Sequence, residues 1–471
     1  MSDVNVILDK FDDFLNPILV KELRQTIRAK FFWILLYLFI TFQTIFICMA
    51  FFEAGVKTHS SGEEIFSFLL TTLLMIGFFS IPLYYGFRFA SERMEKSDEL
   101  LYITTATPHQ IIMGKFLAGV IFVLMIYSLY APFMSLTFFL SGVEIFQSLF
   151  LLGFSFLFAA MSSMVLLAFA AASNTQATKN LFRTCSIGLQ VIVFSFLYNY
   201  LNWYTNRYGI FSGENLKMYF GFILISLFVT YFFYGTAAST ISPEGSNRLL
   251  WIRTRFSVIS IITYLITIGF FHNSEGSVVW GILFTIFNSV FLLIGVSEPF
   301  DYSTRVQREV PKSKLKKYLM FPFFTGTLNA FVWCFIMQIF ITVLASAGST
   351  KLGSHADEFF LFIFSAFLSV GFYALLASFI RRRFFSNIAT SSTWMIGVIV
   401  IILGIFFQTV SSVFLQVFGL AIFGFLNPFY AFNKGVAPIT SSLVMFSIMM
   451  FLHLKVFSAQ YLSYMHANKN G

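Results

Sequence analysis

Segment 91–108 combines clustered carboxylates, a short apolar patch and helix-capping residues. Its acidic part carries four carboxylates within eight residues, and an apolar patch follows: Glu92, Arg93, Glu95, Lys96, Ser97, Asp98 and Glu99, then Leu100, Leu101 and Tyr102. Thr107 and Pro108 then have the types that cap and begin a helix. An acidic shoulder beside an apolar tip suits docking in a groove of a partner protein. An ordinary solvated loop is the alternative interpretation.

Motifs for catalysis or nucleotide binding are missing from the sequence. It contains no HExxH, GxSxG or GxxxxGK(S/T) pattern, and His109 stands where the first glycine before Gly114-Lys115 would be needed. The six histidines have no metal-ligand spacing, and the three cysteines lie in apolar runs. We therefore expect no catalytic residue, no metal and no cofactor in this chain.

The composition places these residues in a membrane protein. Of 471 residues, 58% are hydrophobic, 20% are aromatic and only 11% are charged, whereas soluble proteins average about 25% charged residues. So little charge cannot cover a soluble surface, and so much apolar surface excludes a disordered chain. The sequence predicts an all-α fold, a polytopic transmembrane helical bundle.

Apolar runs long enough to cross the hydrocarbon layer predict about twelve spans. We expect them near residues 31–52, 66–90, 115–140, 147–172, 184–203, 218–240, 256–272, 278–297, 319–346, 359–380, 389–411 and 440–458. With the N-terminus inside, 25 of the 30 Lys and Arg residues fall on the inner side. This distribution favours cytoplasmic N- and C-termini. It also accounts for the net charge of +9 without nucleic acid.

The segment before the first span has the pattern of an interfacial helix, within residues 1–30. Asn16 is a good N-cap, and Pro17 suits the first helical position. At helical spacing one face carries Leu19, Val20, Leu23 and Ile27, and the other carries Lys21, Arg24, Gln25 and Arg28. Glu22 is a further polar residue of this helix. We expect the apolar face to rest in the membrane boundary and the basic face to meet lipid headgroups or a partner. A plain positive patch beside the membrane is the alternative.

The expected spans offer almost no ionisable side chains, apart from Arg88, His453 and Lys455 near their inner ends. Ion-coupled transporters typically place carboxylates or proton relays at mid-membrane. If this protein moves a molecule uphill, we expect the energy to come from a separate ATPase that docks on the inner face.

Two stretches resemble the permease subunit of ABC-2-type exporters. The first is NPILVKELRQTIRAKFF from Asn16, and the second is ERMEKSDELLYITTATPHQIIMGKF from Glu92. The matching positions are Glu92, Arg93, Ser97, Glu99, Leu100, Leu101, Thr107, Pro108, Gly114 and Lys115, whereas Lys96 stands where the family commonly has glycine. LNPFYAF at 426–432 is similar to the family's segment before the last span.

The resemblance implies that loop 91–114 is a coupling element that touches the ATPase, which binds ATP and Mg. Family permeases have about six spans per unit and work as two units, so we expect two six-span halves, 31–240 and 241–471. The inner loop 298–317 stands where the first half has its coupling loop, and Ser297-Glu298 matches Ser91-Glu92. We interpret it as a degenerate second coupling loop with Glu298, Asp301, Arg305, Arg308 and Glu309, against the alternative of an ordinary positive-inside loop.

The apolar run in segment 412–439 is too short to cross the membrane, because Phe414–Phe425 is only a dozen residues long and Asn427-Pro428 follows it. We expect a re-entrant segment, with a tilted thirteenth span as the alternative.

These observations predict the permease subunit of an ATP-driven exporter in a bacterial inner membrane. Its partners are ABC ATPase subunits and membrane lipids, and its substrate is unknown, with a weak preference for a lipid-like or amphipathic molecule. A non-transporting membrane scaffold for an ATPase is the second hypothesis, and a membrane-embedded lipid-modifying enzyme is the third.

Overall fold

The described part of the chain consists of helices, turns and short connections, without any strand. A computed structural model describes residues 16–54, 61–94, 107–138, 145–173, 213–242, 247–271, 274–298, 304–348, 355–385, 393–404 and 437–466, together with parts of 176–195. Ten helical stretches within these ranges are long and apolar enough to cross a membrane. The chain is therefore an all-α polytopic membrane protein, as its composition predicts.

Ten of the twelve expected spans coincide with these long helices. The other two, 184–203 and 389–411, coincide with shorter apolar helices at Phe182–Ser195 and Thr393–Gly404. Both of these expected spans extend beyond the described residues, so the number twelve stays a prediction. Segment 412–439 also lies outside the described residues, except that its last three residues begin the final helix.

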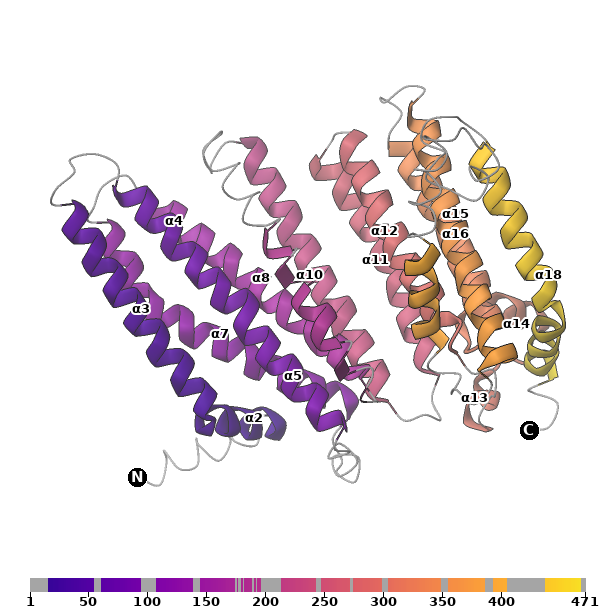
Figure 1. The fold of residues 1–471 in the computed structure, drawn as a ribbon, viewed down its shortest axis with the longest axis horizontal. Coiled ribbons are helices and arrows are strands. Elements are labelled where there is room, and N and C mark those ends of the chain that lie inside the picture. Colours follow the sequence, from indigo (N-terminus) through magenta and orange to yellow (C-terminus); the bar gives the residue numbers. More distant parts are fainter. Residues whose placement is uncertain are drawn as a thin grey trace. The chain divides into compact units, whose positions relative to one another are not determined.

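The chain divides into two compact units, Met1–Ser242 and Pro243–Gly471, coloured indigo to magenta and pink to yellow in Figure 1. The boundary expected from the sequence, 240–241, lies beside this division. The helices of the first unit are α2 (Pro17–Arg28), α3 (Lys30–Ala54), α4 (Ser61–Leu74), the π-helix η1 (Met75–Ser80), α5 (Ile81–Met94), α7 (Pro108–Phe138), α8 (Ile145–Ala171) and α10 (Gly213–Ile241).

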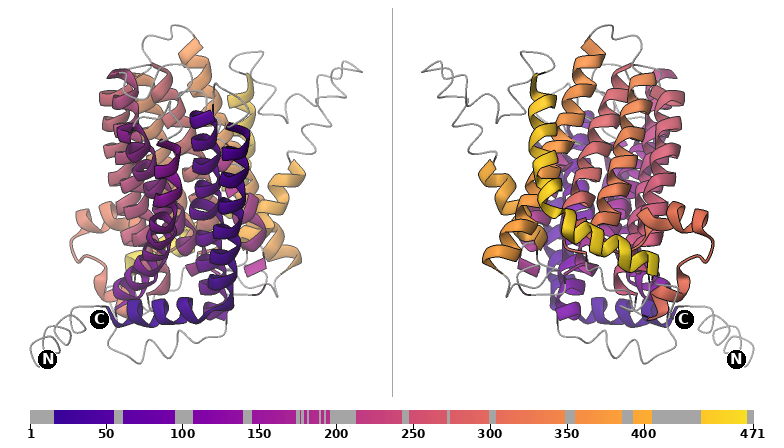
Figure 2. Two further views of the ribbon diagram at one scale, coloured as in Figure 1. Left: turned by 90° about the vertical axis from the view of Figure 1, so that its left-hand side faces the viewer. Right: turned by 90° about the vertical axis from the view of Figure 1, so that its right-hand side faces the viewer.

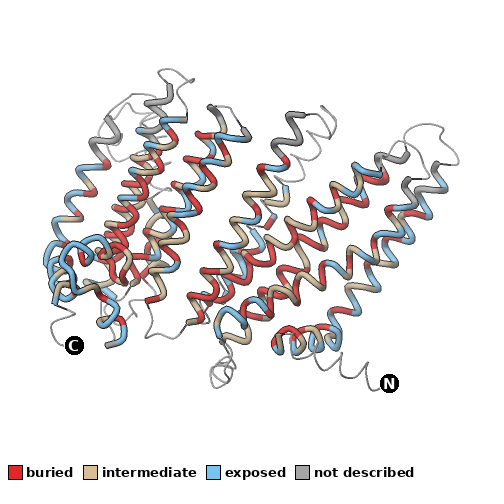
Figure 3. The backbone as a smooth tube through the Cα atoms, turned by 180° about the vertical axis from the view of Figure 1, so that it is seen from behind, coloured by how far each residue is buried: buried red, intermediate tan, exposed pale blue. Residues whose placement is uncertain are grey.

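Helix α2 lies across the ends of the long helices of its unit (Figures 1 and 2). The long helices bury one side and leave large apolar side chains exposed on the other, and this alternation runs along each tube in Figure 3. On α3, for example, Phe32 and Phe39 are buried, whereas Ile34 is 60% and Leu38 is 65% exposed. Such surface is stable against lipid chains and costly against water.

The second span of the first unit runs from α4 through η1 into α5, and a proline shapes it. Pro82 has no N–H to donate to the carbonyl of Phe78, four residues earlier. The hydroxyl of Ser162 on α8 donates to that carbonyl at 3.0 Å, and Gln190 Nε2 donates to the Ser162 oxygen at 2.6 Å. Neighbouring side chains thus satisfy the backbone group that proline frees, as the absence of water in a bilayer requires.

The second unit contains α11 (Arg248–Phe271), α12 (Ser274–Gly295), α13 (Thr304–Glu309), α14 (Lys314–Met320), the 3₁₀ turn η2 (Phe321–Phe323), α15 (Thr327–Gly348), α16 (His355–Phe384) and α18 (Ala437–His466). Several boundaries differ from the expected ones, and the last span ends at His466 instead of near 458. The span expected from residue 319 begins only at Thr327, because η2 and the positive φ of Gly326, 136°, interrupt the helix. The span expected from residue 256 begins at Arg248.

Ser162→Ala should lower the free energy of unfolding by about 1 kcal/mol, because the Phe78 carbonyl loses its donor inside the membrane. Unfolding of the detergent-solubilised chain by a denaturing detergent, followed by circular dichroism, measures this change. Ser128→Ala is the control, because the exposed Ser128 hydroxyl bonds only to Met125 in its own helix. Equal losses in the two variants would contradict this role of Ser162.

Candidate functional site

Helix α2 is fixed to the start of α7 by its own first residues. Asn16 is the N-cap, and its side chain accepts a hydrogen bond from the Ile18 N–H at 3.0 Å, while Pro17 opens the helix. These two predictions from the sequence are confirmed. The Asn16 amide also donates to the carbonyl of Gln110 at 2.6 Å. A Cβ on Gly114 would lie 2.9 Å from the Ile18 Cβ, so glycine permits this close approach of α2 and α7.

Four charged side chains close a ring at this junction. Lys115 Nζ on α7 lies 2.6 Å from Glu22 Oε1 on α2 and 2.5 Å from Glu92 Oε2 on α5. Arg88 on α5 lies 3.4 Å from the other Glu22 oxygen through Nη2 and 3.1 Å from the other Glu92 oxygen through Nε. Each carboxylate thus faces both cations, and the ring has no net charge. We call Glu22, Arg88, Glu92 and Lys115 the charge ring.

The charge ring is largely withdrawn from solvent. The side chains of Glu22 and Lys115 are 2% and 4% exposed, against about a fifth for Arg88 and Glu92. The Lys115 ammonium also lies 4.9 Å from the centroid of the Phe89 ring. Removing one partner from a buried ion pair leaves an uncompensated charge, which costs far more than the pair itself contributes. The ring therefore fixes α2, α5 and α7 to one another.

Hydrogen bonds surround the charge ring on the α2 side. Thr26 and Tyr85 join their hydroxyls at 2.9 Å, and Tyr85 also donates to the Ala118 carbonyl at 3.3 Å. Arg88 further donates to the Gln25 side chain. The buried face of α2 thus carries Ile18, Leu19, Glu22 and Thr26.

The basic residues of α2 point away from this contact. Lys21, Arg24 and Arg28 are exposed, and Ile27 is 45% exposed. The apolar stripe expected to enter the membrane boundary is therefore divided: Leu19 is buried in the face that packs on the protein, whereas Ile27 is exposed. Glu22 belongs to the packed face, not to the polar surface on which its sequence neighbours lie.

The predicted coupling loop begins and ends at the charge ring. Glu92 and Arg93 belong to the last turn of α5, and Thr107 and Pro108 begin α7, where the Gln110 N–H donates to the Thr107 hydroxyl at 3.3 Å and the Thr107 N–H donates to the Gln110 side chain at 2.9 Å. The predicted helix start at Pro108 is confirmed. The remaining predicted contact residues lie outside the described residues: Glu95, Lys96, Ser97, Asp98, Glu99, Leu100, Leu101 and Tyr102.

The second unit has a buried ion pair after its own second long helix. The Arg253 guanidinium on α11 lies 2.6 and 2.7 Å from the two Glu298 oxygens, just past α12. It also donates to the carbonyls of Pro322 and Phe324 at 2.6 and 2.7 Å. Glu298 in turn accepts from the Gly326 N–H at 3.0 Å. This pair joins α11, α12 and the start of α15.

Burial raises the pKa of the Glu298 carboxyl above its usual range, while Arg253 and the Gly326 N–H act in the opposite direction. The other predicted residues of this loop do not join Glu298 in a described cluster. Arg305, Arg308 and Glu309 lie on α13, where they are exposed, and Asp301 lies outside the described residues.

Sequence reasoning identified some of these residues without their contacts. Arg88 was expected near the inner end of its span, but its pairing there with Glu22 and Glu92 was not predicted. Arg253 was not singled out, because it lay in the loop before the expected span at residue 256. The sequence does contain one sign of the two buried ion pairs. In both halves a Ser-Glu pair stands at the end of the second span, with the glutamates Glu92 and Glu298.

Comparison with known proteins adds no relative. No family model, curated protein or solved structure matches the chain. Within the described ranges, no group of three or more His, Cys, Asp and Glu side chains could hold a metal ion. The described contacts show that charged side chains hold α2, α5 and α7 together at the two ends of the predicted loop.

Lys115→Met should lower the free energy of unfolding by about 3–5 kcal/mol, because Glu22 stays buried with only the longer contact to Arg88. The measurement is denaturing-detergent unfolding of the purified chain. Lys21→Met removes the same charge from an exposed position of α2 and should change stability by less than about 0.5 kcal/mol.

The double variant Glu22→Gln/Lys115→Met separates charge pairing from lost packing. It removes one charge of each sign and leaves Arg88 paired with Glu92, so at least half of the lost stability should return. A double variant no more stable than Lys115→Met alone would show that the charge ring does not bind these helices together.

Arg253→Lys should lower the free energy of unfolding by about 2–3 kcal/mol, because one ammonium cannot reach the carboxylate and both carbonyls in the planar geometry of a guanidinium. Arg305→Lys, at an exposed position of α13, is the matched control. Thermal unfolding of both variants in detergent measures the difference, and equal behaviour would contradict the role given to Arg253.

Proposed function

We propose that this chain is the membrane subunit of an ATP-driven exporter of the ABC-2 type, with separate ATPase subunits that bind ATP and Mg. The observation that carries the proposal is the charge ring, because it ties both ends of the predicted coupling loop to α2. The resemblance at Asn16–Phe32 and at Glu92–Phe116 supports an ABC ATPase as the partner.

The charge ring suits the transmission of force. Glu92 lies three residues before the segment 95–106, and Lys115 lies nine residues after it. A displacement of this segment by an ATPase would reach α5 and α7 together, since both are held to Glu22. The interfacial helix would move with them as one body. Rocking of packed helices against a second unit is a known way to open a path across a membrane.

The proposal places the loop 95–106 and both termini in the cytoplasm of a bacterial cell, with the permease in the inner membrane. Supporting it, most Lys and Arg residues fall on that side of the predicted topology. An apolar or amphipathic substrate agrees with the aromatic and aliphatic helices of both units. A scaffold that holds an ATPase without transport would use the same loop and the same charge ring.

Glu95→Lys/Glu99→Lys should reduce binding of the ATPase at least tenfold, because two attractive charges become repulsive. Glu92 is left intact, since its carboxylate belongs to the charge ring. The full chain is purified from its native membranes, and mass spectrometry tests whether a P-loop ATPase co-purifies with it. The ATP hydrolysis that co-purifies with each variant then measures how much ATPase stays bound.

Asp357→Lys/Glu358→Lys is the matched control, because this reversal lies in the first turn of α16, at the end that the predicted topology puts on the outer side. Unchanged partner and activity in both double variants would overturn the docking assignment. In reconstituted vesicles, ATP hydrolysis that is stimulated by a transported amphiphile supports export. Hydrolysis that no amphiphile changes favours the scaffold.

A further inference from the structure

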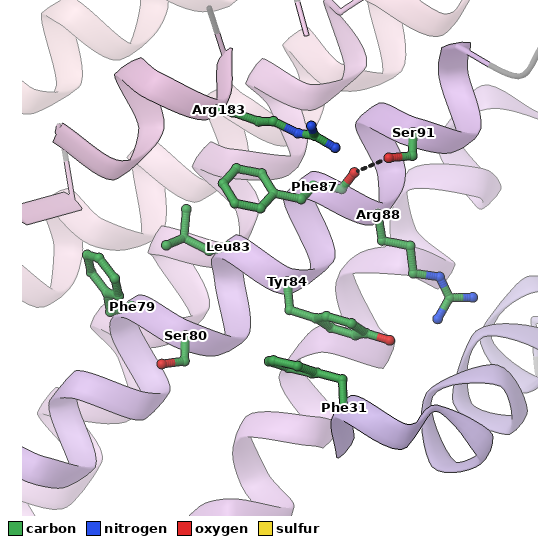
Figure 4. Close-up of a pocket in the computed structure, with 9 residues that line it drawn as sticks. All are labelled: Phe31, Phe79, Ser80, Leu83, Tyr84, Phe87, Arg88, Ser91 and Arg183. Carbon is green, nitrogen blue, oxygen red and sulfur yellow. Dashed lines mark hydrogen bonds between the residues drawn. The ribbon is translucent and has the colours of Figure 1, made fainter. Parts of the chain in front are cut away.

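A pocket of about 460 Å³ opens on the first unit beside α5 and η1. Figure 4 shows Phe79 and Leu83 at an apolar end of the pocket, away from Arg88, and Arg183 above Phe87. The pocket lies beside the charge ring and shares only Arg88 with it.

The polarity of the pocket changes along α5 from apolar to charged. Its lining runs from Phe79 to Ser91, twelve residues along the helical axis, which is about 18 Å. The span itself covers Ile65–Arg93, so the charged part lies at the end of the span and the apolar part reaches toward its middle. This gradient matches a molecule with a polar head and an apolar tail.

The charged part carries a net positive charge. The charge of Arg88 is balanced within the neutral charge ring. Arg183 is exposed, its guanidinium lies 5.9 Å from the centroid of the Phe87 ring, and no carboxylate of the described residues forms an ion pair with it. An anionic group would therefore be attracted to Arg183, and a guanidinium suits phosphate in particular.

Aromatic pairs form the walls. Phe31 and Tyr84 stack with centroids 4.5 Å apart and planes at 9°, and Phe87 meets Phe182 edge-on at 5.8 Å. At the apolar end, Phe79 and Ser80 belong to the π-helix η1, a wider turn of the kind that often occurs at functional sites. The pocket thus has an irregular turn at its apolar end and two arginines in its charged part.

We propose that one anionic phospholipid occupies this pocket. Its phosphate lies at Arg183, beside Arg88, and one acyl chain follows Leu83 toward Phe79 and Ser80. Basic pockets between transmembrane helices bind anionic headgroups by the same chemistry. This inference requires only that the chain lies in a membrane, and it does not rest on the proposed exporter function.

The test titrates the full chain in a neutral detergent with phosphatidylglycerol and counts the bound lipid by native mass spectrometry. One lipid should bind with clear preference over phosphatidylcholine. Arg183→Gln should weaken this binding roughly tenfold, the loss of one charge-assisted contact. Lys179→Gln removes the same charge four residues earlier in the chain, outside the pocket lining. This variant should bind phosphatidylglycerol as the unaltered chain does.

A second variant tests the apolar part without changing charge. Ser80→Phe fills the apolar end and should also weaken binding, whereas Ser128→Phe, at an exposed position of α7 outside the lining, should not. Millimolar inorganic phosphate should fail to displace the lipid. Three outcomes overturn the proposal: wild-type affinity in Arg183→Gln, equal binding of phosphatidylcholine, or displacement by inorganic phosphate alone.

Discussion

The structure of the first unit depends on the rule that charge cannot be left unpaired where water is scarce. Lys115 and Glu22 lie almost wholly inside protein, yet they come from helices far apart in the sequence. Their attraction offsets the loss of hydration only when geometry is good and every oxygen has a partner. The charge ring meets this condition, with two carboxylates that each bridge two cations. The position of α2 across the other helices follows from it.

The second unit meets the same constraint with different residues. Glu298 follows the second long helix of its unit, as Glu92 ends the second span of the first unit. Glu92 pairs with Lys115 on the next long helix, whereas Glu298 pairs with Arg253 on α11, the preceding long helix. Backbone carbonyls of Pro322 and Phe324 complete the shell of Arg253, where the first unit uses a second carboxylate. The shared element is a buried glutamate where the helix meets the next loop.

The class of fold could be predicted from the sequence because composition alone decides it, and local capping at Asn16, Pro17 and Pro108 could be predicted because it depends on neighbouring residues. The contacts of Glu22 and Arg253 could not, since they depend on helices that meet only after folding. A hydropathy criterion ends the predicted span before Arg253, because arginine is charged. In the structure Arg253 lies within the first turns of α11, where two carbonyls and the two Glu298 oxygens accept its hydrogen bonds. The break before Thr327 was missed because Phe321 and Phe323 are as apolar as the span beyond them.

The π-helix within the second span affects how that span can change in evolution. In a π-helix each N–H bonds to the carbonyl five residues earlier, whereas in an α-helix it bonds to the carbonyl four residues earlier. The η1 turn therefore accommodates one extra residue. A helical wheel drawn through 65–93 without this extra residue would assign Arg88 and Glu92 to a face about 100° away from the observed one. Loss of one residue within 75–80 can be absorbed by tightening that turn. The same deletion between 83 and 88 would rotate the carboxylate of Glu92 away from its lysine.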